Sequence, residues 1–269
     1  MYFIVYNVVW VILCCFVSSL SAKKRVEPPV LSDSNNCQKD ILDRTGFNLQ
    51  SIHRSNIYED FKNGKKGPSQ RTIEHNVAGW GLQKSFFDHI LHQNNATFIV
   101  EVGSWQGLSA IHMGKTMKQY SNCGVILCVD TWLGTPMAWM DFNEHGNELH
   151  NNAGYPSVYY NFLYNVKSEG LSDTIIPLPM PSQQGAIFLK HISKIKNKLP
   201  DLIFIDACHD RECTYNDILT WYPLVSKGGI LFGDDWNIPG TRGGVQAAAD
   251  FLGIGDKIVP MKRYWMLHK

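Results

Sequence analysis

The stretch from Leu199 to Trp236 constrains the fold more than any other part of this 269-residue chain. It contains two short apolar runs, Leu202–Ile205 and Ile230–Phe232, each bounded by polar residues or glycine. Runs of this kind are typical of fully buried parallel strands. Because apolar residues recur at roughly helical spacing between the two runs, the sequence predicts a strand–helix–strand unit of a parallel sheet.

Acidic residues follow both of these predicted strands. Asp206 comes after the first strand, with His209 close by, and Asp234 and Asp235 come after the second. These side chains should converge, because ligands of open parallel sheets bind outside the carboxyl ends of the strands. Two like charges about 4 Å apart repel by roughly 4 kcal/mol at an effective dielectric of 20. A proton, a basic side chain or a divalent cation must therefore offset the charge, unless single aspartates cap a helix or face solvent.

The rest of the chain alternates predicted strands with predicted helices. Strands are predicted over residues 97–103, 125–129, 174–178, 202–205 and 230–232, with a closing pair over 257–260 and 263–267. Helices are predicted over residues 82–91, 108–117, 159–166, 184–195, 218–224 and 243–251. The alternation predicts an α/β fold with a doubly wound, mostly parallel, Rossmann-like sheet of six or seven strands and helices on both faces.

The N-terminal region differs from the rest in composition. Residues 1–20 carry no charged side chain, and small residues lead up to Ala22, after which Lys23–Arg25 are basic. This pattern predicts either a signal peptide over residues 1–22 or an uncleaved membrane anchor there. Either feature predicts a protein of the secretory pathway. The protein would be secreted, retained in the lumen of the ER or Golgi, or anchored in a membrane. Residues 23–72 are polar and predict a linker and N-terminal cover before the main domain of residues 73–269.

Charge and cysteine content narrow the range of partners. The net charge is +1, so bulk electrostatics give no sign of nucleic-acid binding. Of the seven cysteines, Cys14 and Cys15 lie in the apolar run, and the odd number that remains leaves at least one thiol outside intramolecular disulfides. No C-x-x-C pair indicates zinc. The stretch Asn95–Thr97 is an N-glycosylation acceptor sequence.

A glycine-containing turn links the first strand of the main domain to its helix. It runs from Glu101 to Gly107, and glycine there allows the backbone to turn tightly and approach a ligand closely. Asp130 ends the next strand, where a carboxylate can accept hydrogen bonds from ribose hydroxyls. The turn and the acid together predict a nucleoside-type ligand, and they do not distinguish a dinucleotide from S-adenosylmethionine (SAM).

Residues 75–269 resemble class I SAM-dependent methyltransferases, and most closely the O-methyltransferases similar to macrocin O-methyltransferase and the cephalosporin-hydroxylase-like proteins. The resemblance is carried by the segments Glu101–Ala110, Cys128–Gly134, Asp206–Asp210 and Gly228–Trp236. It assigns eight residues to the cofactor: Glu101, Gly103, Ser104 and Gly107 by the methionine side, Asp130 at the ribose, Thr131 and Trp132 beside the adenosine, and Ser182 at the adenine side.

The resemblance also implies a metal and a reaction. In its metal-dependent members, the positions of Asp206, Asp234 and Asp235 hold Mg²⁺, which agrees with the charge argument above. The reaction would be direct methyl transfer from SAM to a hydroxyl of a sugar, a glycan or another small polyhydroxylated acceptor. His209 is the candidate catalytic base, and Asp206 is the alternative. In the other interpretation, His209 only hydrogen-bonds an aspartate.

Two other functions remain open from the sequence. One is a non-catalytic nucleoside-binding protein that keeps the methyltransferase fold, and the other is a hydroxylase-like enzyme on the same fold. A nicotinamide dehydrogenase is disfavoured by the glycine spacing. The segment Pro136–Tyr155 falls where a lid would lie. Membrane attachment through residues 1–22 and assembly into a homo-oligomer also stay open.

Overall fold

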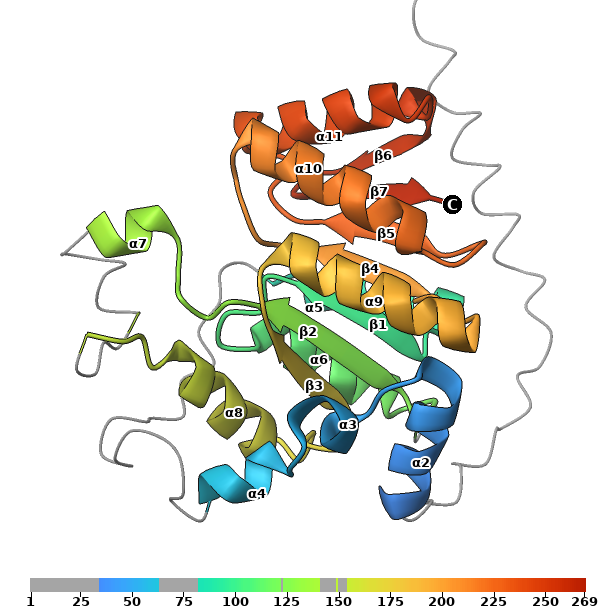
Figure 1. Ribbon diagram of the computed structural model, residues 1–269. Coiled ribbons are helices and arrows are strands. Elements are labelled where there is room, and N and C mark those ends of the chain that lie inside the picture. The colour runs from blue at the N-terminus through green and yellow to red at the C-terminus, as the bar shows by residue number, and fades with distance from the viewer. Residues whose placement is uncertain (1–33, 63–81, 122, 141–148, 150–153) are drawn as a thin grey trace, which may run out of the picture. The chain divides into compact units, whose positions relative to one another are not determined.

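A seven-stranded sheet forms the centre of the computed structural model, which describes residues 34–62, 82–121, 123–140, 149 and 154–269 (Figure 1). The strand order is β3-β2-β1-β4-β5-β7-β6. The strands are β1 (Phe98–Val102), β2 (Val125–Asp130), β3 (Ile175–Pro179), β4 (Leu202–Ile205), β5 (Ile230–Gly233), β6 (Ile258–Met261) and β7 (Tyr264–His268). β1 to β5 pair in parallel, and β7 runs antiparallel to both β5 and β6. The predicted fold class is confirmed.

The direction of winding changes between β1 and β4. β2 and β3 extend the sheet on one side of β1, whereas β4 and β5 extend it on the other. β1, β4 and β5 are buried along their whole length, which explains their apolar, β-branched sequences. At such a switch point the loops after the two central strands separate and leave a crevice for a ligand. The turn after β1 and the acids after β4 and β5 border this crevice.

Helices cover both faces of the sheet. In Figure 1, α9 and α10 lie in front of the strands, and α5 and α6 lie behind them. The helices are α2 (Ser34–Thr45), α3 (Leu49–His53), α4 (Ile57–Lys62), α5 (Lys84–Asn94), α6 (Leu108–Met117), α7 (Pro136–Met140), α8 (Val158–Ser168), α9 (Ser182–Lys196), α10 (Arg211–Trp221) and α11 (Pro239–Phe251), with 3₁₀ turns at Tyr222–Leu224 and Gly255–Lys257. Phe86 of α5 stacks on Tyr264 of β7 at 4.2 Å between ring centroids. Phe87 packs edge-on against Phe204 of β4 at 5.1 Å, so aromatic rings fasten α5 to the sheet.

The N-terminal cover is more ordered than its polar composition indicated. Within residues 34–62 the chain forms α2, α3 and α4. Ile41, Phe47 and Tyr58 are each at most 1% exposed, and the Tyr58 hydroxyl donates to the Ile175 carbonyl oxygen at 2.8 Å. The few apolar side chains of this segment thus join the core, together with the polar side chain of Thr45, which is 1% exposed. The expectations for residues 1–33 and for residues 63–72 lie outside the described residues.

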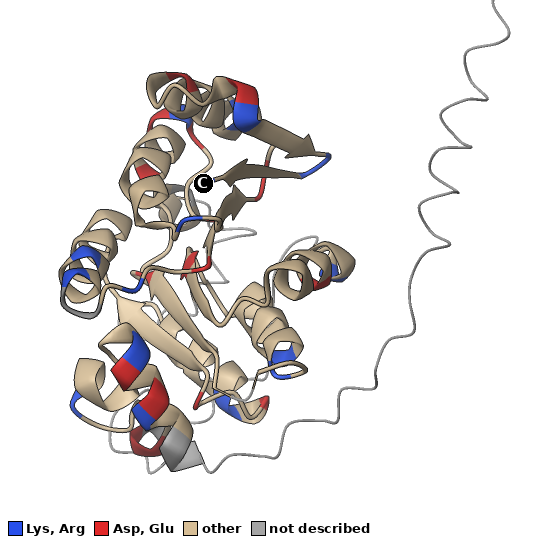
Figure 2. Ribbon diagram, turned by 90° about the vertical axis from the view of Figure 1, so that its right-hand side faces the viewer, with Lys and Arg blue, Asp and Glu red and all other residues tan. Residues whose placement is uncertain are grey.

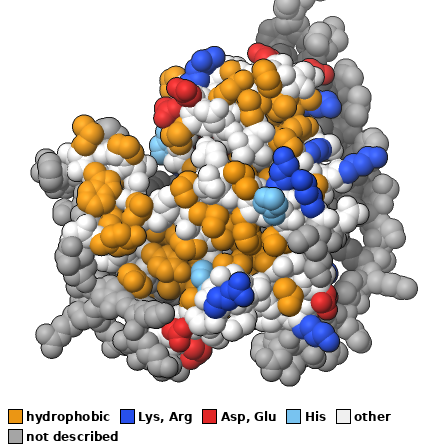
Figure 3. Space-filling model, viewed as in Figure 1, with side chains coloured by type: hydrophobic (Ala, Val, Ile, Leu, Met, Phe, Trp, Pro, Cys, Tyr) orange, Lys and Arg blue, Asp and Glu red, His pale blue; other side chains and the backbone are white. Residues whose placement is uncertain are grey.

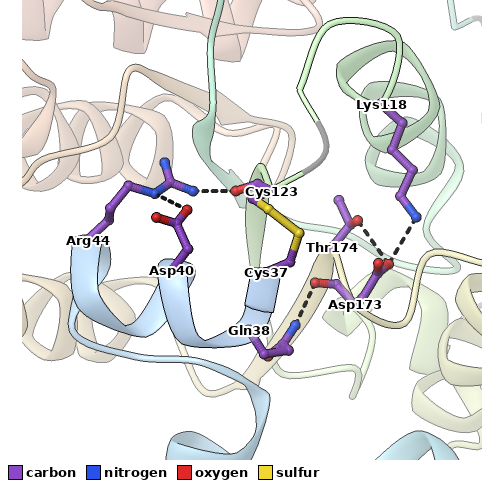
Figure 4. The surroundings of a disulfide bond; sticks show 8 residues. All are labelled: Cys37, Gln38, Asp40, Arg44, Lys118, Cys123, Asp173 and Thr174. Carbon is purple, nitrogen blue, oxygen red and sulfur yellow. Dashed lines mark hydrogen bonds and ion pairs between the residues drawn. A yellow bond between two sulfur atoms is a disulfide. The ribbon is translucent and has the colours of Figure 1, made fainter. Parts of the chain in front are cut away.

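A disulfide attaches α2 to the main domain. Cys37 bonds Cys123, which precedes β2 (Figure 4). Beside it, the Arg44 guanidinium donates to the Cys123 carbonyl oxygen, and the Gln38 side chain donates to the Asp173 carbonyl oxygen at 2.7 Å. These links explain how a segment with few apolar residues stays packed against the sheet.

Charge is distributed unevenly over the elements. Most strand positions are uncharged, and charged residues are spread over the helices and the loops at the ends of the strands (Figure 2).

None of the helices in the described part of the chain combines the length and apolar character needed to cross a membrane.

Candidate active site

The turn after β1 is shaped by a close approach of two backbones. Gly103 has φ +86°, and a Cβ placed on it would lie 2.0 Å from the carbonyl oxygen of Asp206. Only glycine fits, because any side chain would collide with backbone that cannot move aside easily. Gly107, with φ +94°, precedes the first residue of α6. We call residues 103–107 together with Asp130 the cofactor turn.

The Asp130 carboxylate holds the cofactor turn in place. Its Oδ2 accepts hydrogen bonds from the backbone N–H groups of Ser104 and Trp105, both at 2.9 Å. Its Oδ1 accepts the N–H of Trp132 at 2.7 Å. An ionised carboxylate has about four acceptor positions, so roughly one is left for a ligand hydroxyl on this half-buried side chain. Asp130 therefore lies where a ribose is expected, and it also supports the turn.

Glu101 has a supporting position rather than an open one. It is fully buried in β1, where its Oε1 accepts a hydrogen bond from the Ser109 hydroxyl of α6. Burial raises the pKa of the Glu101 carboxyl to about 7, and the hydrogen bond from Ser109 opposes this increase. Because no part of Glu101 is exposed, the predicted direct contact with the cofactor is corrected to a contact with α6.

The two residues expected beside the adenosine differ in exposure. Thr131 is half-buried, and its hydroxyl oxygen accepts the Leu133 N–H at 3.2 Å. Trp132 is only 1% exposed, and its indole N–H donates to the Trp105 carbonyl oxygen at 2.7 Å. Its ring packs against Phe162 of α8 at 4.9 Å. The prediction that Trp132 flanks a ligand is wrong for its ring, which is a core side chain below the turn.

Ser182 is engaged by two neighbouring side chains. Its hydroxyl donates to the Asp217 carboxylate at 2.5 Å and accepts the Trp221 indole N–H at 2.8 Å. Burial raises the pKa of Asp217 to about 6, and the Ser182 hydrogen bond opposes this increase. These hydrogen bonds make Ser182 a link between α9 and α10, and its expected contact with adenine stays a prediction.

Three ionisable side chains meet where β4 and β5 end. Carboxylate oxygens of Asp206 and Asp235 and a ring nitrogen of His209 all lie within 4.8 Å of one another. His209 Nε2 is 3.0 Å from Asp235 Oδ2. These residues, with Thr241 and Trp265, line a hollow at the crevice. We call Asp206, His209 and Asp235 the acid cluster, and oxygen and imidazole donors at this spacing suit a divalent cation.

Asp234 pairs with an arginine, although the sequence predicted a metal ion as its partner. Its Oδ1 pairs with the Arg263 guanidinium and accepts the Asp235 N–H at 2.6 Å. Arg263 lies between β6 and β7, and its Nη2 is also 3.5 Å from Asp235 Oδ1. The structure brings Asp206, His209 and Asp235 together, whereas Asp234, the remaining acid of the predicted metal set, is paired with Arg263. The predicted set of Asp206, Asp234 and Asp235 stays a prediction. No local pattern in the sequence pointed to a role for Arg263.

The charges in this region do not cancel. Three carboxylates face one guanidinium, so two negative charges remain when all three are ionised. Burial raises the pKa of Asp206 well above its usual range, and the charges of Asp234 and Asp235 raise it further. A cation bound between these carboxylates would balance the remaining negative charge.

The loop that carries His209 is constrained on several sides. A disulfide joins Cys208 to Cys213 across it. Asp210 caps α10 by accepting the Cys213 N–H at 2.9 Å. A Cβ on Gly240 would lie 2.5 Å from the His209 carbonyl oxygen, so α11 packs directly against the loop. His209 itself keeps an exposed ring, with 57% of its side chain accessible.

Three residues around the site adopt a left-handed backbone conformation. Trp105, Trp132 and Asp235 have φ values of +46°, +52° and +59°. Bulky residues seldom adopt positive φ, and such strain commonly lies at ligand sites whose surroundings enforce it.

The predicted lid is described at its two ends and at Leu149, which is buried. Residues 136–140 form α7, on which Trp139 and Met140 are 42% and 69% exposed. Figure 3 shows hydrophobic side chains gathered over this helix. Tyr155, at the other end of the segment, is 62% exposed. His145 and His150 lie outside the described residues.

Comparison with known proteins identifies the family. The family model described as a methyltransferase domain matches residues 100–236, which is just over half of the chain. The chain belongs to this family. The match includes the cofactor turn and the acid cluster and confirms the predicted class I SAM-dependent methyltransferase.

Solved structures share the fold of the methyltransferase. The O-methyltransferase NovP is 17% identical, with a TM-score of 0.51, and the match covers 88% of this chain and 99% of that one. An O-methyltransferase from Bacillus cereus in complex with SAH is 15% identical, with a TM-score of 0.48 and coverage of 87% and 97%. A sequence comparison of the methyltransferase with curated proteins gives no match.

The cofactor turn of the methyltransferase fits a SAM-type ligand. The Trp105 indole N–H is buried and has no hydrogen-bond partner among the described residues. Such a donor is costly to leave unpaired, so a bound acceptor would satisfy it. Gly107 leaves the first turn of α6 without a side-chain cap, so its N–H groups remain available to an anionic group.

Proposed function

We propose that this protein is a divalent-metal-assisted O-methyltransferase acting on a hydroxyl of a sugar or another small polyhydroxylated acceptor. One observation supports it above the rest: the cofactor turn and the acid cluster adjoin, since Gly103 lies against the backbone of Asp206. The bound methyl donor and the cation would therefore be neighbours. Transfer requires this proximity, because the sulfonium methyl and the acceptor oxygen must meet in line.

The cofactor turn would bind the donor. Asp130 has an acceptor position left for a ribose hydroxyl, and the Trp105 indole N–H and the start of α6 offer donors. When bound, SAM supplies the electrophilic methyl group. The chain contributes orientation, because the turn is held rigidly by Asp130 and by the packing of Gly103 on Asp206.

Asp206 and Asp235 would hold the cation. When bound, a divalent cation lowers the pKa of a coordinated hydroxyl and fixes its position. Two neighbouring hydroxyls can chelate such an ion, which is why a sugar or polyol suits the site. A hydroxyl acceptor also agrees with the name of NovP, whose fold the chain shares.

His209 would remove the proton from the acceptor hydroxyl. Its Nε2 faces Asp235 Oδ2 at 3.0 Å, so Nε2–H donates to the carboxylate and Nδ1 is left to accept a proton. Asp235 then both orients the imidazole and stabilises its positive charge after proton transfer. The exposed ring has room to meet an acceptor entering from solvent.

The proposed location is the secretory pathway. The disulfides Cys37–Cys123 and Cys208–Cys213 are of the kind that persist in oxidising compartments. The apolar residues 1–20 agree with entry into that pathway, through either a signal peptide or an anchor.

Calorimetric titration of the full chain with SAM, in Mg²⁺ and again in chelator, tests the donor. We expect binding in both conditions, because the cofactor turn needs no metal. A folded chain that binds SAM in neither condition would exclude the methyltransferase proposal. A panel of sugars and polyols, assayed with SAM for methylated products, then tests the acceptor class.

Paired variants test the metal. Asp235→Asn should weaken Mn²⁺ binding about tenfold or more and abolish metal-stimulated turnover, because it removes a ligand charge. Asp234→Asn should mainly lower stability, because it breaks the ion pair with Arg263. His209→Ala should retain Mn²⁺ affinity and lose turnover. Loss of Mn²⁺ affinity in His209→Ala would make the imidazole a ligand instead of the base.

A further inference from the structure

Asn95 occupies an exposed turn between α5 and β1. It follows the last residue of α5 and adopts a left-handed conformation with φ +45°. Its side chain makes no hydrogen bond or ion pair with any described residue, and the residue is exposed. Asn94, its neighbour, is half-buried, and its amide donates to the Ile90 carbonyl oxygen at 2.7 Å. The two adjacent asparagines therefore differ in whether the amide nitrogen is free.

Thr97, the third residue of the acceptor sequence, has structural contacts of its own. Its N–H donates to Asp201 Oδ2 at 2.9 Å, and its hydroxyl accepts from Arg44 at 3.3 Å. Arg44 also binds the carbonyl of Cys123 beside the Cys37–Cys123 disulfide (Figure 4). These contacts form in the folded chain, whereas a glycan is added to an Asn-x-Thr sequence while the chain is still extended. Folding would then leave Thr97 half-buried in these contacts and Asn95 at the surface.

The position of Asn95 is compatible with a bulky attachment. It precedes β1, whereas the cofactor turn and the acid cluster follow β1 and β4. A five-residue strand is about 16 Å long at roughly 3.3 Å per residue. A group on Asn95 would thus project from the opposite edge of the sheet and leave the crevice open.

We infer that Asn95 carries an N-linked glycan, on the premise of the secretory location proposed above. In the reaction, the Asn95 amide nitrogen bonds to the anomeric carbon of a lipid-pyrophosphate-linked oligosaccharide, and the bond from that carbon to the phosphate oxygen breaks. The amide loses one proton, and the lipid pyrophosphate leaves. The acceptor chemistry is that of any Asn-x-Thr sequence.

Expression of the full chain in eukaryotic cells, followed by treatment with an N-glycan-releasing amidase, tests the inference. The native chain should lose mass on treatment, and Asn95→Gln should have the lower mass from the start. Asn94→Gln is the matched control and should behave like the native chain, as should Thr97→Ser, which keeps both the hydroxyl and the acceptor sequence.

Protease protection of the chain in sealed microsomes distinguishes the two ways to fail. An unmodified chain that is protected inside the vesicles would overturn the glycan at Asn95 and leave the location intact. An unmodified chain that is digested outside them would overturn both the glycan and the secretory location. Neither result would affect the proposed methyl transfer, which is measured on the purified chain.

Discussion

The cofactor turn and the acid cluster lie at the same edge of the sheet, but they are completed in different ways. On one side, Asp130 receives three backbone N–H groups and is nearly saturated by the chain itself. On the other, Asp206 and Asp235 lie close together with a single guanidinium nearby, and burial and like charge raise the pKa of Asp206. The first region is preorganised by folding, whereas the second needs a ligand to balance its charge. Variants should therefore affect stability on the first side and cation binding on the second.

The largest effect is expected at Asp130. Asp130→Ala leaves three backbone N–H groups without their acceptor, so we expect the free energy of unfolding to fall by roughly 3–5 kcal/mol. SAM binding should be lost as well. Asp201→Ala is a matched control, because Asp201 accepts the N–H groups of Thr97 and Phe98 at the opposite edge. Asp201→Ala should also destabilise the chain, but the SAM affinity of its folded fraction should equal that of the native protein. Denaturant unfolding measures the stability, and calorimetry measures the SAM affinity.

Glu101 predicts a pH-dependent stability on the cofactor side. Its pKa is about 7 in the folded chain, against 4.5 for an ordinary glutamate, so the folded state holds a proton that the unfolded state loses first. This contribution is fully present below about pH 4.5 and decreases as the pH rises to about 7, by roughly 3 kcal/mol in all. Glu101→Gln has no proton to lose. The difference in unfolding free energy between Glu101→Gln and the native protein should therefore grow in favour of the variant over this range. A constant difference would mean that Glu101 is ionised in the folded chain.

Gly103 tests the junction between the two regions. Gly103→Ala adds a Cβ within 2.0 Å of the Asp206 carbonyl oxygen at a positive φ, so we expect a loss of about 2–3 kcal/mol in unfolding free energy. Gly170→Ala provides the comparison, because Gly170 has φ +67° with no atom within 4 Å of the added Cβ. It should cost only about 1 kcal/mol, the cost of the conformation alone. Equal losses in thermal unfolding would show that the close approach is not a constraint.

The smallest effect is expected from the Cys208–Cys213 disulfide. Replacing both cysteines by serine should loosen the loop that carries His209 and weaken Mn²⁺ binding about threefold, because the ligand and base positions become less fixed. The Cys37→Ser/Cys123→Ser pair should lower thermal stability and leave Mn²⁺ affinity as it is. Hydrogen exchange of residues 206–214 reports on the loop directly. Native exchange rates there in the Cys208→Ser/Cys213→Ser variant would show that hydrogen bonds alone hold the loop.

The sheet could be predicted from the sequence because its strands are buried on both faces. β4 covers Leu202–Ile205, as predicted, since a continuous apolar run bounded by polar residues has few other places to lie. α2 was not predicted, because only Cys37 and Ile41 are buried among its described apolar side chains, the third buried residue is the polar Thr45, and no apolar stripe marks the helix. A local sequence pattern therefore predicts a helix or strand only where most residues of that helix or strand are buried.

The place of the acid cluster could be predicted from the sequence, but the partner of Asp234 could not. That Asp206 and Asp235 converge follows from the ends of parallel strands, which is a property of the topology. The pairing of Asp234 depends on Arg263, which lies 29 residues further on in the chain. The burial of Trp132 likewise depends on Phe162 of α8. Contacts between residues so far apart in sequence leave no local signal.

The Cys37–Cys123 disulfide has a consequence for proteolysis. It joins two points that are 86 residues apart. A protease that cuts the backbone once anywhere between them leaves two pieces that remain one covalent molecule. Whatever the N-terminal piece carries, whether an anchor or an added tag, stays joined to the catalytic part until a reductant is added. On a denaturing gel, such a nicked protein would run as a single band without reductant and as two bands with it.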